Sequence, residues 1–263
     1  MVSKPDWCIY IGPRENPDAC ICARIESNKR CGDAGWLHKL TDKRWDIPKH
    51  EPHQDEPLPD FTRMQQWFRR DVQKVDIESF ASSLGLTSYS LNRLGIGWCG
   101  WGWTFPMRDE GGVVRGVRVR KPDGSKLAIT GSKDGLFVPD GLEYACGIYI
   151  CEGPTDTAAM LDMGFEAVGR PSCQGATKTL AALVAKIKPP FVAIVADSDA
   201  PGMKGAMMLK KEIAPITWSY IFNPPAKDVR AFLIENGNRE DLLSVAKVSD
   251  DRARALYSLT RPS

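Results

Sequence analysis

The chain has 263 residues, of which 43% are hydrophobic and 26% charged, and 35 Lys and Arg against 33 Asp and Glu leave a net charge of only +2. These values are typical of globular proteins and exclude a disordered, collagen-like or coiled-coil chain, and the length allows one large domain or two modest ones. No run of about 18 apolar residues is present and the first residues lack the apolar core of a signal peptide, so we expect no membrane association and a cytoplasmic location.

The first segment, 1–45, is rich in cysteine. Four of the eight cysteines of the chain fall within its first 31 residues, namely Cys8, Cys20, Cys22 and Cys31. In a reducing compartment, clustered cysteines hold a metal more often than they form disulfides. These four are candidate zinc ligands, with His38 as a substitute, although no Cys-x₂-Cys pair is present. Free structural thiols are the alternative.

A linker and a basic segment follow. Four prolines in fifteen residues mark 46–60 as a linker. The next segment, 61–145, begins with helical patterns from residue 61, over 77–84 and over 88–94. Short strands over 103–107, 113–120 and 126–129, separated by turns at 109–112 and 122–124, then predict an antiparallel meander.

The meander carries the strongest local charge. Residues 108–133 contain seven Lys or Arg against three Asp or Glu, a local charge of +4. Three tryptophans, Trp98, Trp101 and Trp103, lie just before it or at its start. The charge suits phosphate groups, and the tryptophans either stack on unpaired bases or pack in the core. A solvated strand face is the alternative interpretation of the charge.

The segment 146–240 alternates apolar strands with helices. Strands are expected over 147–151, 165–168, 191–196 and 216–222, and helices over about 155–163, 176–187, 201–213 and 228–235. Unbroken apolar strands that alternate with helices predict an α/β fold, a parallel sheet with helices on both faces. We expect ligands at the carboxyl ends of its strands. Residues 241–263 are expected to form a C-terminal tail.

Carboxylates lie shortly after the carboxyl ends of these strands. Glu152 and Asp156 follow the first strand, Asp197 and Asp199 the third, and Asp228 the fourth. Carboxylates that converge repel one another unless a cation is present, and oxygen ligands suit Mg²⁺ or Mn²⁺. Such an ion would polarise phosphate oxygens. The alternative is that each acid only caps a helix.

The motif Glu152-Gly-x-x-Asp156 after one strand, followed by Asp197-x-Asp199-x-x-Gly202 after another, resembles the Toprim domain. Bacterial-type primases, topoisomerases, certain nucleases and recombination mediators share this domain. The resemblance implies that Glu152 is a general acid or base or a metal ligand, and that the two aspartates bind Mg²⁺. Lys227-Asp228 is similar to a later Lys-Asp motif of primases, in which the aspartate adds to the metal site.

The segment before the motif resembles the basic subdomain of bacterial replicative primases and of phage primase-helicases of the T7 and Twinkle type. The shared features are a Phe-Pro-x-x-Asp strand, a glycine turn, an arginine-bearing strand and a lysine in a short strand. The resemblance assigns Arg108, Arg118, Arg120 and Lys126 to template, primer or nucleotide phosphates. Arg170, in a loop similar to one of the primases, is a further phosphate contact or belongs to an ordinary turn.

The resemblance extends to the N-terminal cysteines. Primases of this class carry a four-ligand zinc module that recognises the template, and Cys8, Cys22 and His38 lie in stretches that resemble its second half. The usual opening Cys-x-x-Cys would lie upstream of Pro5, where this chain has Met-Val-Ser-Lys. A degenerate or truncated module is therefore an alternative to a zinc site.

These observations together favour a Mg²⁺-dependent primase of phage, plasmid or mobile-element type. Such an enzyme joins ribonucleoside triphosphates on a single-stranded DNA template, with a separate replicative helicase as a partner, since no Walker A motif is present. Two alternatives stay open. One is a metal-dependent nuclease that uses the same carboxylates, and the other is a non-catalytic module that binds nucleic acid or recruits a helicase.

Overall fold

The computed structural model describes residues 8–12, 15–22, 25–29, 31, 35–41, 59–196 and 200–248. The chain divides into two compact units, which we call unit 1 (1–57) and unit 2 (58–263). No helix in the described ranges is long and apolar enough to cross a membrane.

Unit 1 contains a small antiparallel sheet in the order β1-β2-β3. Its strands are β1 (Cys8–Ile11), β2 (Ala19–Cys22) and β3 (Trp36–Lys39). Cys8 is paired directly with Cys22, and Cys20 with His38. Because paired residues and alternate residues along a strand share a face, these four side chains lie on the same side of the sheet.

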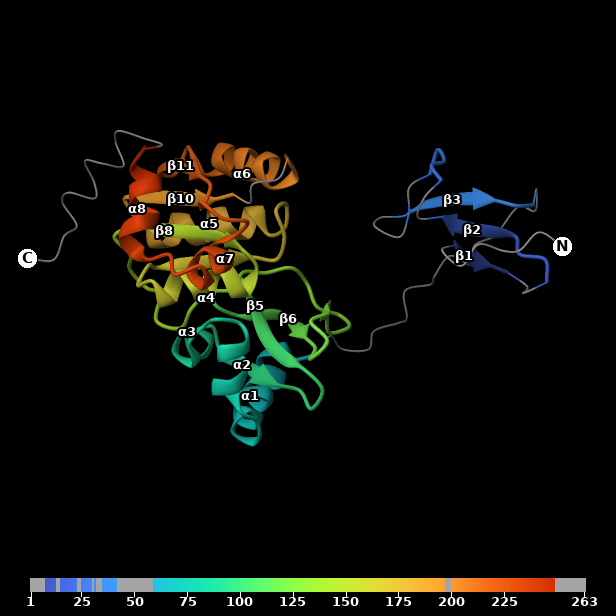
Figure 1. Ribbon diagram of the computed structural model, residues 1–263, viewed down its shortest axis with the longest axis horizontal. Helices are drawn as coiled ribbons and strands as arrows, with labels where there is room; N and C mark the ends of the chain where they lie inside the picture. Colours follow the sequence, from blue (N-terminus) through green and yellow to red (C-terminus); the bar gives the residue numbers. More distant parts are fainter. Residues whose placement is uncertain are drawn as a thin grey trace, which may run out of the picture. The chain divides into compact units, whose positions relative to one another are not determined.

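Unit 2 begins with three short helices at one end of the unit (Figure 1). They are α1 (Phe61–Asp71), which continues into the 3₁₀ helix η2 (Val72–Lys74), α2 (Ile77–Ser83) and α3 (Ser88–Arg93). The side chains of Asp60, Asp76 and Thr87 accept hydrogen bonds from the backbone N–H groups of the first turns of α1, α2 and α3. These N-caps explain where the helical patterns of the sequence begin.

The predicted meander is an antiparallel sheet in the order β4-β5-β6-β7. Its strands are β4 (Gly97–Trp98), β5 (Trp103–Arg108), β6 (Val114–Arg120) and β7 (Lys126–Ala128). Val117 and Val119 pack with α1 on one face. Arg118 and Arg120 alternate with these valines and therefore lie on the opposite face.

The second half of unit 2 is a parallel sheet in the order β11-β10-β8-β9, and this confirms the predicted fold class (Figure 1). The strands are β8 (Ile148–Glu152), β9 (Ala167–Arg170), β10 (Phe191–Val195) and β11 (Trp218–Phe222). The helices are α4 (Gly153–Asp162), α5 (Thr177–Ile187), α6 (Ala200–Ile213), α7 (Val229–Ile234) and α8 (Arg239–Val248).

Both faces of the parallel sheet are buried. Ile148 and Ile150 pack with residues of α5 and α6, whereas Tyr149 and Cys151 pack with residues of α4, α7 and α8. Helix α8 was not among the helices expected from the sequence. Its Leu242 is fully buried in the core, so this segment belongs to the folded unit.

Candidate functional site

A cavity of about 260 Å³ lies where the carboxyl ends of the parallel strands face the antiparallel sheet. Its lining comes from the end of β8 and the start of α4, from β5, β6 and β7, and from the residues just before α7. Three carboxylates and four cationic groups line it: Glu152, Asp156 and Asp228, and Arg118, Arg120, Lys126 and Lys227. The structure therefore brings seven of the sequence-predicted site residues to one cavity.

Glu152 is the last residue of β8 and directly precedes α4. The chain turns here through Gly153, whose φ of +76° is readily adopted only by glycine. The Glu152 side chain makes no capping hydrogen bond to α4. The carboxylate is therefore not used as a helix cap, which was the alternative interpretation of this residue.

Asp156 and Asp228 also accept hydrogen bonds from the backbone of α7. The backbone N–H of Arg230 donates to Asp156 Oδ1 at 3.0 Å, and that of Ala231 donates to Asp228 Oδ1 at 2.7 Å. Both carboxylates thus hold the first turn of α7, and Asp228 is its N-cap. The capping interpretation is correct for these two residues, and it does not exclude a second contact to a cation.

The cationic wall of the cavity comes from β6 and β7. Arg120 is paired with Lys126, and Arg118 lies two residues before Arg120 on the same face. Arg118 Nε is buried and, within the described part of the chain, has no hydrogen-bond acceptor. Burial and, after it, the charge of Arg230 lower the pKa of Arg120. Buried donors and adjacent cations favour the binding of an anion here.

Asp197 and Asp199 lie outside the described residues. The residue before them, Ala196, is held from two sides, because its N–H donates to the Phe222 carbonyl at 3.0 Å and its carbonyl accepts from Asn223 Nδ2 at 2.9 Å. Sequence reasoning missed Asn223. The only signal for it was its position directly after the fourth strand.

Arg108 is not part of this cavity. Its guanidinium forms an ion pair with Asp140 at 3.2 Å, and Arg69 contacts the same carboxylate at 2.7 Å. The second terminal nitrogen of Arg108 donates to the Gly112 carbonyl at 3.3 Å. In this structure Arg108 therefore ties β5 to neighbouring loops, and it does not lie with the other residues that the sequence assigned to phosphates.

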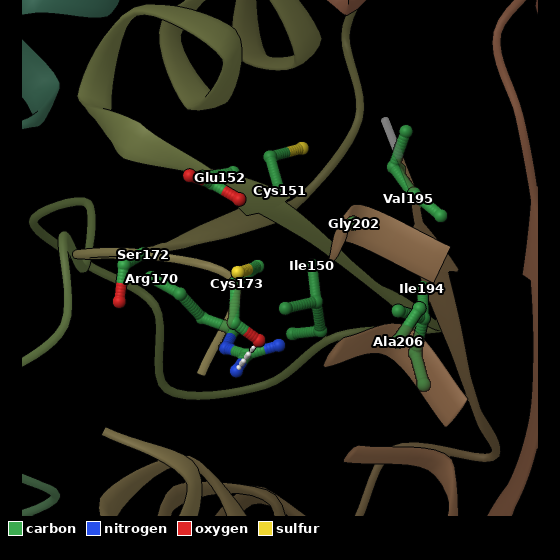
Figure 2. A pocket seen from close by; sticks show the side chains of 11 residues that line it. Ile150, Cys151, Glu152, Arg170, Ser172, Cys173, Ile194, Val195, Gly202 and Ala206 are labelled. Carbon is green, nitrogen blue, oxygen red and sulfur yellow. Dashed lines mark hydrogen bonds between the residues drawn. The ribbon is translucent and has the colours of Figure 1, made fainter. Parts of the chain in front are cut away.

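Arg170 lies beside Glu152, its partner in the pairing of β8 with β9, and it is only 5% exposed. Figure 2 shows its guanidinium directed at the main-chain carbonyl of Cys173, with which it forms a hydrogen bond. Its Nε donates to the Gly175 carbonyl at 3.3 Å. Burial lowers the pKa of Arg170, and the charges of Cys173 and Glu152 partly restore it.

The small cavity beside Arg170 measures about 20 Å³, room for about one water molecule. The hydrogen bonds of Arg170 support the interpretation of an ordinary turn, because they hold the loop that joins β9 to α5. The larger cavity lined by Glu152 and the cationic wall is the candidate ligand site.

The donor set of the larger cavity suits magnesium. No group of three or more His, Cys, Asp or Glu within the described residues is arranged to hold a metal ion. Magnesium is usually bound through one or two carboxylates, with water and substrate phosphates completing its shell. Glu152, Asp156 and Asp228 supply carboxylates at the cavity, and the opposite cations suit phosphates. The residues present therefore fit a phosphate-bound magnesium ion.

The thiols of unit 1 gather only in part. The pKa of the Cys8 thiol is raised to about 11. The largest cause is burial, followed by a hydrogen bond to Cys22 and the charge of Cys22, and then by Cys20. The backbone N–H of Ile25 donates to Cys22 Sγ at 3.2 Å. These contacts place Cys8, Cys20 and Cys22 near one another. Cys31 is also described, yet no metal-binding group of three was found there.

Comparisons with known proteins find likeness in structure but none in sequence. No family model matches the chain, and no curated protein matches it. The primase fragment of the bacteriophage T7 primase-helicase matches with a TM-score of 0.52 and 19% identity, over 63% of this chain and 72% of that one.

Two further solved structures agree. The DnaG primase catalytic domain bound to single-stranded DNA has a TM-score of 0.55 and 15% identity, over 76% of this chain and 89% of its own. The Aquifex aeolicus primase, with its zinc-binding and RNA polymerase domains, has a TM-score of 0.54 and 18% identity, over 72% of this chain and 60% of its own. The chain thus shares the fold of primase catalytic cores.

Proposed function

We propose that this protein is a Toprim-type DNA primase that joins ribonucleoside triphosphates on a single-stranded DNA template with Mg²⁺. The observation that carries this proposal is one cavity in which carboxylates at strand ends face four cationic side chains. A polymerising site needs both kinds of group, because a cation must be held while the phosphates of two substrates are neutralised.

The acidic side would hold magnesium. Glu152, Asp197 and Asp199, with Asp156 and Asp228 in support, are the proposed ligands. Bound magnesium, or manganese in its place, supplies a Lewis acid for phosphate oxygens. Glu152 would accept the proton of the attacking 3′-hydroxyl or ligate the metal, and its backbone position at the end of β8 directs it to the cavity.

The basic side would hold nucleic acid and nucleotide. Arg118, Arg120, Lys126 and Lys227 line the cavity opposite the carboxylates, and the unpaired buried Nε of Arg118 supplies a donor for a phosphate oxygen. The DnaG domain of similar fold binds single-stranded DNA. We therefore assign template and triphosphate to residues 61–145 and the metal to residues 146–240. We also infer a cytoplasmic enzyme that works with a replicative helicase.

The test is template-directed synthesis. The native protein, incubated with single-stranded DNA, Mg²⁺ and labelled ribonucleoside triphosphates, should produce short RNA oligomers, and Asp197→Ala should produce none. Absence of product on varied templates would contradict the proposal. Metal-dependent cleavage of DNA or RNA without triphosphates would indicate the nuclease alternative. Tight binding that is unchanged by loss of Glu152 and Asp199, with no turnover, would indicate a non-catalytic module.

A zinc site in unit 1 is a separate part of the proposal. Cys8, Cys20 and Cys22 share one sheet face, and Cys31 or His38 would complete the set of four. We expect purified protein to contain about one equivalent of zinc, and Cys22→Ser to lose it, because structural sites need all four ligands. Cys146→Ser, at an exposed cysteine of unit 2, is the control. Zinc well below one equivalent in native protein would exclude the site.

A further inference from the structure

Trp101 stands at the tip of a tight turn between β4 and β5. The backbone N–H of Cys99 donates to the Gly102 carbonyl at 3.1 Å, and the Cys99 thiol donates to the same oxygen at 3.3 Å. Gly102 lies against β6 so closely that an added Cβ would come within 2.6 Å of Val119 Cγ1 and 3.0 Å of the Arg120 carbonyl. The turn is therefore fixed against the end of β6.

The three tryptophans around this turn differ in their surroundings. Trp103 is 7% exposed and stacks on Phe80 with ring centroids 4.4 Å apart, and Trp98 meets its edge at 5.3 Å. These two belong to the core, which was the alternative to base stacking for the tryptophans. Trp101 is 46% exposed, although a large apolar side chain gains free energy by burial. Its ring is therefore not part of the core and is accessible to a ligand.

A cation accompanies the exposed ring. Lys121 Nζ lies 5.9 Å from the centroid of the Trp101 ring, and Lys121 directly follows Arg120, which lines the candidate cavity. The space over the turn is open, because a Cβ added at Gly100 would meet no described atom within 4 Å. An aromatic face, a cation and open space thus lie at the end of β6, the strand that carries Arg118 and Arg120, while neither Trp101 nor Lys121 lines the cavity itself.

We propose that Trp101 stacks on an unpaired base of the single-stranded DNA that enters the cavity, with Lys121 on the adjacent phosphate. Sequence-tolerant binding of single strands combines a cationic track for the backbone with aromatic rings for the bases. Arg118 and Arg120 line the cavity from β6, and Lys121 follows them at the end of the strand, over the exposed ring of Trp101. The proposal rests on the proposed function, and it adds a base contact to a site otherwise built of charges.

The test compares two single strands that differ only in their bases. Fluorescence anisotropy measures binding of the native protein and of Trp101→Ala to oligodeoxythymidylate and to an abasic oligomer of equal length. We expect Trp101→Ala to weaken binding to oligodeoxythymidylate by about 5- to 100-fold and to leave binding to the abasic oligomer unchanged. Trp101→Phe, which keeps an aromatic face, should retain most of the affinity.

Unchanged affinity of Trp101→Ala for oligodeoxythymidylate, or an equal loss on both oligomers, would overturn the stacking proposal. Tyr144→Ala is the matched control, because Tyr144 is 73% exposed and lies outside the cavity. It should bind as the native protein does. Binding is measured without triphosphates, so the two proposals fail separately. A native protein that binds but makes no primers would contradict priming alone. A native protein that makes primers, together with a Trp101→Ala variant that binds as the native does, would contradict this inference alone.

Discussion

Primer synthesis by the Glu152→Gln variant is expected to fall by about 10²- to 10⁴-fold, the usual contribution of a general base. Glutamine has the shape of glutamate but cannot accept the proton of the 3′-hydroxyl, and it offers a metal ion no charge. The Glu152 side chain does not cap α4, so the substitution should change the thermal midpoint of unfolding only through the loss of its attraction to Arg170. Steady-state rates of labelled oligomer formation, measured together with thermal unfolding, check both parts.

The control for this variant is Glu143→Gln, which removes an exposed carboxylate upstream of β8. It should synthesise primers at the native rate. A Glu152→Gln protein that folds as the native does and keeps the native rate would show that the catalytic base, the metal ligand or both lie elsewhere. The cavity would then be a binding site only.

Arg170→Met is expected to lower the free energy of unfolding by about 2–4 kcal/mol, because the buried Arg170 side chain donates to two partly buried loop carbonyls that would lose their donor. Methionine fills similar volume but cannot donate to the carbonyls of Cys173 and Gly175. Thermal and urea unfolding measure the loss. Arg170→Lys, which keeps the charge but not the planar set of donors, should lie between the native protein and Arg170→Met.

Arg70→Met is the matched control, since Arg70 is exposed on α1. A surface change of this kind should shift the free energy of unfolding by less than about 0.5 kcal/mol. If Arg170 contacts phosphate and does not hold the loop, the result would be different. Arg170→Met would then unfold as the native protein does, and its Michaelis constant for ribonucleoside triphosphates or its dissociation constant for DNA would rise.

Much of unit 2 could be predicted from local patterns. The alternation of apolar strands and helices over 146–240 predicted a parallel sheet with helices on both faces, and the structure has one. The meander was equally readable, because glycine turns separate its strands. Helix α8 was missed since its buried face has few positions, among them Leu242 and Ala246.

The sequence by itself identified seven of the charged side chains that line the cavity. Carboxylates at or shortly after the carboxyl ends of parallel strands meet at one sheet edge, so Glu152 and Asp228 could be assigned to it from the pattern alone. Arg118 and Arg120 could be placed on one face of the sheet because side chains alternate along a strand.

Only the tertiary structure decided what each charged or aromatic side chain contacts. Arg108 pairs with Asp140, Asp156 accepts from Arg230, and Trp101 is exposed whereas Trp103 is buried. The partners of Arg108 and Asp156 lie 32 and 74 residues away along the chain. Hydrophobic periodicity reports which face of an element is buried, but it does not report which distant element covers that face. Contacts of this kind depend on how the elements pack together, and no local pattern encodes them.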